Sequence, residues 1–247
     1  MALTTLALAK AVVFPILFSV VLVVLIRRQA KIWFLLLAFA FGCLGAFSVN
    51  HSFLRHLPTF YAEGEIRAVT NMQAWLSGFV EAAIPEEFAK GIWICVLLIG
   101  WRRYSAGRGA LIGGLVGLGF AFRENLEYAR TVAEWRVLGA LSHAEWGLIM
   151  GTLLERGFGG IKLNVSSIVW AFLATIALHG LLDTSVFLVE AFEAKTGLTP
   201  GNESPEALMS PLLLAAMALT ALVEIASLAW AIQIIRGVRR APVSPQH

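Results

Sequence analysis

The chain has 247 residues, of which 58% are hydrophobic and only 14% are charged, and its net charge of +3 is small. Soluble domains carry about 25% charged residues, so this composition excludes an ordinary soluble domain and indicates a membrane protein. No basic run is interleaved with aromatic residues, so we expect no nucleic-acid partner. The hydrophobic excess extends over the whole chain, and we expect a single transmembrane domain, residues 1–247, in a lipid bilayer.

Seven apolar segments are long enough to span a membrane. A helix needs about 20 apolar residues to cross the hydrocarbon core. The first segment lacks a basic region ahead of its apolar stretch and a clear cleavage site, so we expect a retained helix and not a signal peptide. The sequence therefore predicts an all-α protein with seven transmembrane helices, at roughly 8–26, 32–50, 72–100, 109–129, 137–154, 166–190 and 210–235.

Basic residues are distributed unequally between the two sets of connecting segments. Basic connections stay in the cytoplasm. We therefore expect the N-terminus outside the cell, the C-terminus inside, and a cytoplasmic tail over residues 236–247. The side that collects most of the basic residues holds Arg27, Arg28, Lys31, Arg102, Arg103, Arg108, Arg156, Lys162, Arg236, Arg239 and Arg240.

The third predicted helix carries the sequence IPEEFAK at residues 84–90, inside an otherwise apolar run. A charged group at the bilayer centre costs about 2.5–3.5 kcal/mol on insertion scales, so such residues are candidates for function. Lys90 lies one turn from both Glu86 and Glu87, and a purely structural ion pair is the simpler alternative. Pro85 cannot donate a backbone hydrogen bond, which predicts a kink just before the two acids.

Three later helices also carry polar residues at helical spacing. Phe120 and Glu124 lie four residues apart in the fourth, and His143 begins the fifth. A lone histidine could merely bond a backbone carbonyl. In the sixth, His179 and Asp183 lie four residues apart, a spacing at which a carboxylate can fix the tautomer of an imidazole.

The depths of these residues suggest one common site. At about 1.5 Å per residue, each lies roughly 20–24 Å from the cytoplasmic end of its helix, in the outer half of a core about 30 Å thick. Structural polar residues would be scattered in depth, and a proton relay would cross several depths. We therefore expect one site from four helices, with Glu87, Glu124, His143 and His179 at its level.

The residue types favour hydrolysis by an activated water. The chain has no Gly-x-Ser-x-Gly or His-Glu-x-x-His sequence. Glu124, His143 and His179 could hold Zn²⁺ with an open water position. Alternatively, a desolvated glutamate, Glu86 or Glu87, could act as general base while a histidine stabilises the oxyanion. Both routes lead most simply to cleavage of a peptide bond within the membrane.

Taken together, these residues resemble the PrsW family of intramembrane proteases, which is similar to the CAAX-protease and bacteriocin-processing superfamily. The resemblance covers about residues 72–190. Arg136 also resembles a family arginine, whereas Arg108 stands where the family often has an acidic residue. The matching motifs are Glu86-Glu87-x-x-Lys90, Phe120-x-x-x-Glu124-Asn125, His143, and His179-x-x-x-Asp183.

The resemblance implies site-1 type cleavage of a single-span membrane protein, such as an anti-sigma factor, in the cytoplasmic membrane. It implies catalytic roles for the acids and histidines of these motifs. Lys90, Phe120 and Asn125 would support them, and Zn²⁺ is the candidate cofactor. The candidate catalytic residues are Glu86, Glu87, Glu124, His143, His179 and Asp183.

Two other functions fit parts of the pattern. An ion- or proton-coupled transporter also uses acids within the membrane, and Glu145 and Glu224 are its best candidates because they have no catalytic role in the first hypothesis. Such transporters usually contain repeats that this sequence lacks. A non-catalytic seven-helix receptor or scaffold would not explain the common depth. The substrate and the oligomeric state are left open by the sequence.

Overall fold

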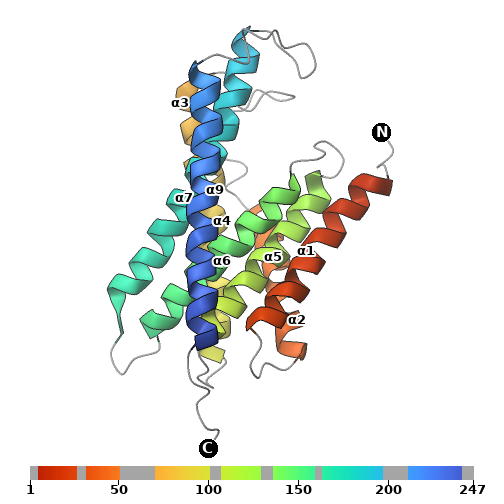
Figure 1. The fold of residues 1–247 in the computed structure, drawn as a ribbon, viewed down its shortest axis with the longest axis vertical. Coiled ribbons are helices and arrows are strands. Elements are labelled where there is room, and N and C mark those ends of the chain that lie inside the picture. Colours follow the sequence, from red (N-terminus) through yellow and green to blue (C-terminus); the bar gives the residue numbers. More distant parts are fainter. Residues whose placement is uncertain are drawn as a thin grey trace, which may run out of the picture.

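The computed structural model describes residues 5–26, 32–50, 70–100, 107–128, 136–158, 163–196 and 211–240. Within these ranges the chain is helical and has no strand (Figure 1). The π-helical segment η2 continues directly from α3 and into α4, so the described chain forms seven helical runs. In order they are α1 (Thr5–Ile26), α2 (Ile32–Asn50), α3 (Asn71–Leu76) with η2 (Ser77–Ala83) and α4 (Ile84–Gly100), α5 (Arg108–Tyr128), α6 (Arg136–Phe158), α7 (Val165–Thr196) and α9 (Pro211–Arg240).

The predicted all-α architecture and the seven helices are confirmed. α7 and α9 run further than predicted, and α9 continues as helix to Arg240, inside the segment assigned to the cytoplasmic tail. Figure 1 shows α9 running beside α6 and α7.

Several basic residues used to predict the orientation in the membrane lie outside the described residues, namely Arg27, Arg28, Lys31, Arg102, Arg103 and Lys162.

The outer surface of the bundle is apolar, as expected for a protein surrounded by lipid. Three segments among the described residues are long and apolar enough to cross a membrane: Ile32–Val49, Val165–Val189 and Leu214–Arg240. Large side chains that include Val24, Leu36, Ile99, Trp170 and Ile225 are exposed on the outside of the bundle. Lipid tails are as apolar as these side chains, so the fold must be stabilised by close packing and by polar contacts between helices.

α5 is the central helix of the bundle. It packs against α1, α2, α4 and α6, and its residues from Arg108 to Ala121 are all buried. Its sequence, RGALIGGLVGLGF, is rich in glycine, which lets neighbouring backbones come close. A Cβ added to Gly113 would lie 1.9 Å from the carbonyl oxygen of Gly147 on α6. A Cβ on Gly117 would lie 2.0 Å from the carbonyl oxygen of His143.

An ion pair closes one end of this contact between α5 and α6. Arg108 Nε lies 3.5 Å from Glu155 Oε1, and the other oxygen of Glu155 accepts a hydrogen bond from the backbone N–H of Gly109 (2.9 Å). A carboxylate at this position also complements the N-terminal end of the α5 dipole. The arginine that departs from the family pattern therefore has a partner in α6.

The region before Pro85 is a π-helix. The N–H of Ile84 bonds the carbonyl of Phe79, five residues earlier, instead of following the usual four-residue register. Proline has no N–H to continue the α-helical ladder, and one wider turn ahead of it changes the register before the acids begin. The disruption predicted from Pro85 is therefore present as a π-helical segment, and Glu86 and Glu87 lie in the first turn of α4.

Substitution of Gly113 by alanine tests the close contact of α5 with α6. The added methyl group overlaps the Gly147 carbonyl, so we expect Gly113→Ala to destabilise the protein by about 1–3 kcal/mol. Gly139→Ala is the matched control, because a Cβ there meets nothing within 4 Å. Alanine favours a helix by about 0.5–1 kcal/mol over glycine, so the control should be neutral or stabilising. Thermal unfolding in detergent measures both, and equal stability of the two variants would contradict the close contact.

Candidate functional site

A buried lysine joins residues of three helices at the centre of the site. Lys90 is 0% exposed, and its ammonium lies 2.6 Å from Glu87 Oε1 one turn earlier in α4. It also lies 2.7 Å from Nδ1 of His143 in α6, and 4.4 Å from the centre of the Phe120 ring in α5. A buried charge requires such partners, because leaving it unpaired costs several kcal/mol.

His143 connects this lysine to Glu124. Its Nε2 atom lies 2.9 Å from Glu124 Oε2. An ammonium group has only donors, so Nδ1 of His143 accepts from Lys90 and Nε2 carries the proton donated to Glu124. The contact with Lys90 therefore selects one tautomer of His143.

His179 lies between two carboxylates. Its Nδ1 is 2.8 Å from Glu87 Oε1, and its Nε2 is 3.3 Å from Asp183 Oδ2. In this arrangement both ring nitrogens face acceptors and both can donate. The predicted role of Asp183, to orient His179, agrees with this geometry.

The structure thus brings together the four residues that the sequence placed at one depth. Glu87 bonds His179 directly. Lys90 bonds both Glu87 and His143, and so connects them. His143 in turn contacts Glu124. The links come from four helices, α4, α5, α6 and α7. The depth of each residue in the membrane could be predicted from the sequence, because every α-helix rises by about the same distance per residue.

Glu86 and Glu87, though adjacent, have different surroundings. Glu87 is fully buried, and its Oε1 atom is held by both Lys90 and His179. Glu86 is 13% exposed in its side chain, and its Oε2 atom, which has no hydrogen bond, lies 3.8 Å from both Lys90 and His179. Glu87 Oε2 also lacks a hydrogen bond, so what separates the two acids is that Glu86 is partly exposed and that no hydrogen bond from the described residues holds it, which makes Glu86 the better placed to bond a water molecule.

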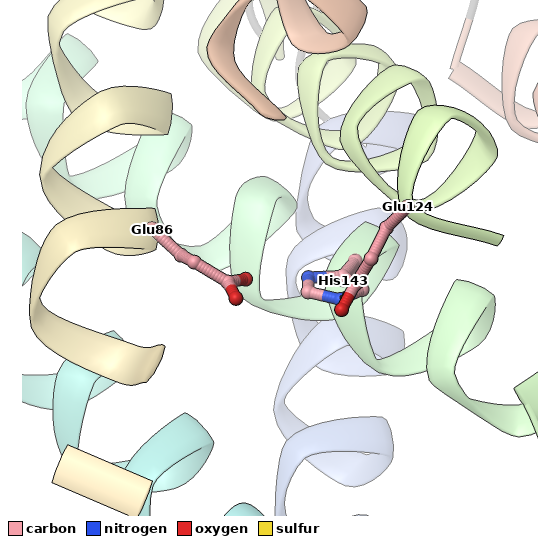
Figure 2. Close-up of side chains that lie close together, drawn as sticks. All are labelled: Glu86, Glu124 and His143. Atoms are coloured by element: carbon pink, nitrogen blue, oxygen red, sulfur yellow. The ribbon is translucent and has the colours of Figure 1, made fainter. Parts of the chain in front are cut away.

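Glu86 faces His143 and Glu124 across a gap, as Figure 2 shows. One ligand atom from each of these three residues lies within 4.8 Å of the other two. Two polar atoms that share a water at about 2.8 Å are up to about 5.6 Å apart. The three atoms are therefore close enough for a single water, or an ion, to bridge α4, α5 and α6.

Aromatic rings surround the polar groups. The indole of Trp146 stacks on His179 with centroids 4.5 Å apart and meets His143 edge-on at 5.4 Å. Trp146 was not among the predicted site residues, although it lies three residues after His143 and hence on the same face of α6. The predicted supporting residues Phe120 and Asn125 are both buried in α5.

The donor set can accommodate a divalent metal under one condition. Carboxylates and imidazoles both bind zinc, and catalytic zinc sites keep three protein ligands and one open position, although their sets usually contain more histidine than this one. Nε2 of His143 must then lose its proton, and Nδ1 must carry one, so Lys90 would turn from donor to acceptor. Metal binding therefore requires the release of a proton here. The set of Glu86, Glu124 and His143 differs from the predicted ligands, because both nitrogens of His179 are directed at carboxylates.

Comparison with known proteins gives one match. The family described as PrsW family intramembrane metalloprotease matches residues 30–220. No curated protein and no solved structure matches the chain. The matched range includes all of the site residues. It extends on both sides beyond residues 72–190, the segment that carries the motifs.

Removal of the buried lysine tests the charge balance of the site. Lys90→Met leaves the buried Glu87 carboxylate with its bond to His179 but without the ammonium, and we expect a loss of up to about 3–5 kcal/mol in unfolding free energy. Adding Glu87→Gln should recover part of this loss, because the buried negative charge is then also removed. Thermal unfolding in detergent compares the variants. Arg156→Met, at an exposed position of α6, is the control and should change stability by less than about 0.5 kcal/mol. A double variant less stable than Lys90→Met alone would contradict the pairing.

Proposed function

We propose that this intramembrane protease cleaves a membrane-anchored protein with Glu86 as the general base. The chain belongs to the PrsW family of intramembrane metalloproteases. The observation that supports this proposal is the gap between Glu86 on one side and His143 with Glu124 on the other. A water held there would contact a carboxylate that no other group neutralises at hydrogen-bond distance. The reaction is hydrolysis of a peptide bond in the outer half of the bilayer.

Proton transfer through Glu86 completes the reaction in two steps. Glu86 takes a proton from the water as its oxygen attacks the peptide carbonyl carbon, which gives a tetrahedral intermediate. When the carbon–nitrogen bond breaks, Glu86 donates that proton to the leaving amine. Such acid–base catalysis typically contributes about 10²–10⁴-fold in rate. The products are a carboxylic acid and an amine, so both protons of the water are accounted for and Glu86 is regenerated as a carboxylate.

The other polar groups have positions suited to stabilising charge. His179 lies 3.8 Å from Glu86, and its two ring nitrogens face Glu87 and Asp183. To donate to the developing oxyanion, its Nε2–H would turn from Asp183 while Nδ1 keeps its bond to Glu87. Lys90 holds Glu87 and His143 in place and supplies a positive charge close to the reacting atoms. Glu124 can accept a bond from the water on the side opposite Glu86, and His143, whose nitrogens bond Lys90 and Glu124, holds Glu124 in place.

A metal ion would change these roles, because Glu86 would then be a ligand and not the general base. Glu86, Glu124 and His143 would hold Zn²⁺, which would lower the pKa of a bound water and polarise a carbonyl. Without an ion, the bond from Lys90 sets the tautomer of His143. Trp146 and Phe120 pack against the polar groups in either case.

We further propose that the substrate is a single-span protein, of the anti-sigma-factor type, in the cytoplasmic membrane. The resemblance to PrsW proteases and the shared depth of the site residues support this proposal. The excess of basic residues in one set of connections supports an outside N-terminus and a cytoplasmic C-terminus. With this orientation the site lies toward the outer face, which suits a site-1 type cleavage.

Substitution of the proposed base should abolish cleavage. We expect Glu86→Gln to reduce kcat by about 10²–10⁴-fold, because the amide cannot accept a proton from water. Glu87→Gln should cost less, since an amide can still bond His179. The measurement is cleavage of a single-span reporter by the purified protein in liposomes.

Glu81→Gln is the matched control for this substitution. Glu81 lies one turn before Glu86 and is bonded by Ser77 (3.1 Å), away from the cluster. Its substitution should leave kcat unchanged. Full activity of Glu86→Gln, or a larger loss in Glu87→Gln, would show that Glu86 is not the base.

Zinc binding by the purified protein distinguishes the two ligand sets. We expect about one proton to be released per Zn²⁺ bound, because His143 must free its Nε2 atom. Glu86→Gln and Glu124→Gln should weaken binding strongly, whereas His179→Gln should retain it. Calorimetry in two buffers of different ionisation enthalpy measures both quantities. Loss of zinc binding on substitution of His179 alone would favour the ligand set of Glu124, His143 and His179.

A further inference from the structure

A second polar cluster lies between α6 and α9, outside the proposed catalytic groups. Ser142 Oγ in α6 donates to Glu224 Oε1 in α9 (2.5 Å). Ser227 Oγ in α9 donates to Glu145 Oε2 in α6 (2.8 Å). Each helix thus offers one serine and one glutamate, three residues apart, and the two pairs bond in opposite directions. We call these four residues the serine–glutamate clamp.

Three residues of the clamp are buried at the level of the site, and Glu224 is half-buried. Ser142, Glu145 and Ser227 are at most 3% exposed. Polar groups are costly to place in a helix that faces lipid, and hydrogen bonds between helices are one of the few forces that hold membrane helices together. A pair of reciprocal bonds at one depth fixes both the height and the rotation of α6 against α9.

The clamp face of α6 adjoins the face that carries the site. At about 100° per residue, the centre of the face of Ser142 and Glu145 lies about 100° from that of His143 and Trp146. On the far side of the site face, Gly147 and Gly151 pack against α5. The site face is therefore held between a glycine contact on one side and the clamp on the other.

The glycine contact alone provides little rotational control. Gly147 meets the backbone of Gly113, and Gly151 meets that of Gly109, so no side chain interlocks at these points. A small rotation of α6 would move Nδ1 of His143 away from Lys90 and the indole of Trp146 away from His179. The polar bonds to α9 are directional contacts that oppose such a rotation, on the side of the site face away from α5; the bonds of Glu155 to α5 lie at one end of the helix contact.

We propose that Glu145 and Glu224 are positioning residues, which act through the serine–glutamate clamp to aim His143 and Trp146 at the proposed catalytic water. This inference rests on the proposed function. It gives the two acids a role as hydrogen-bond acceptors, for which their charge is not required. A role in proton transport would instead require a group that titrates.

Paired substitutions separate these roles. Glu145→Gln and Glu224→Gln keep an acceptor oxygen for the serine, whereas Glu145→Met and Glu224→Met retain a similar size without the acceptor. We expect the methionine variants to lose about 10- to 100-fold in kcat, with little change in KM, because small misplacement of reacting groups has effects of this size. The glutamine variants should keep most of the activity of the wild type.

Thr220→Val is the matched control for the docking of α9. Thr220 bonds Ser185 of α7 (2.6 Å), so its loss weakens a polar contact of α9 that does not involve α6. This variant should keep its kcat.

Ser227→Ala and Ser142→Ala remove the hydrogen-bond donors of the clamp. They are the milder variants to use if a methionine variant does not fold, and they too should lower kcat. Full activity in the variants that lack the bond, or equal loss in the glutamine and methionine variants, would overturn the proposal.

A spectroscopic measurement keeps this test independent of catalysis. The ring nitrogens of ¹⁵N-labelled His143 report its bonds to Lys90 and Glu124, and the signal is assigned by its loss in His143→Gln. We expect it to shift in Glu145→Met and to stay unchanged in Glu145→Gln and in Thr220→Val. An unchanged signal in Glu145→Met would overturn the positioning role. If the wild-type protein cleaves no reporter, the proposed function fails, and this signal still decides whether the clamp orients His143.

Discussion

The rest of the site depends on the two bonds that the buried ammonium group of Lys90 makes, to Glu87 and to His143. The ammonium is fully buried, it neutralises Glu87, and it occupies Nδ1 of His143. A charge in this environment is tolerated only when its partners have a fixed geometry, so the lysine imposes that geometry on α4 and α6. The tautomer of His143, and through it the bond to Glu124, follows from the same contact.

That geometry can be reached because the helices approach closely. In a membrane there is no hydrophobic gain from bringing helices together, and association depends on packing and on polar contacts. The glycines of α5 remove the side chains that would otherwise separate it from α6. Glu124 and His143, on helices joined by this contact, are thereby brought to 2.9 Å.

The π-helical segment explains why two adjacent acids differ in role. Pro85 cannot complete the α-helical ladder, and the wider turn before it resets the register at the start of α4. Glu87 then points into the bundle toward Lys90 and His179, while Glu86 points toward the gap opposite His143. π-Helical turns are often found at functional sites, where they direct a side chain that a regular helix would place elsewhere.

The all-α architecture, the approximate helix bounds and the set of residues at one depth could be predicted from the sequence. These follow from local properties: apolar length, helical rise per residue and the cost of a charge in lipid. The direction of each side chain could not be predicted and depends on the packing of the helices. The tertiary structure distinguished Glu86 from Glu87, directed both nitrogens of His179 at carboxylates, and placed Trp146 against His179. It also joined Glu145 and Glu224 to serines of the opposite helix. The rotation of a helix about its axis depends on contacts between segments far apart in the chain, and these contacts have no signature in the local sequence.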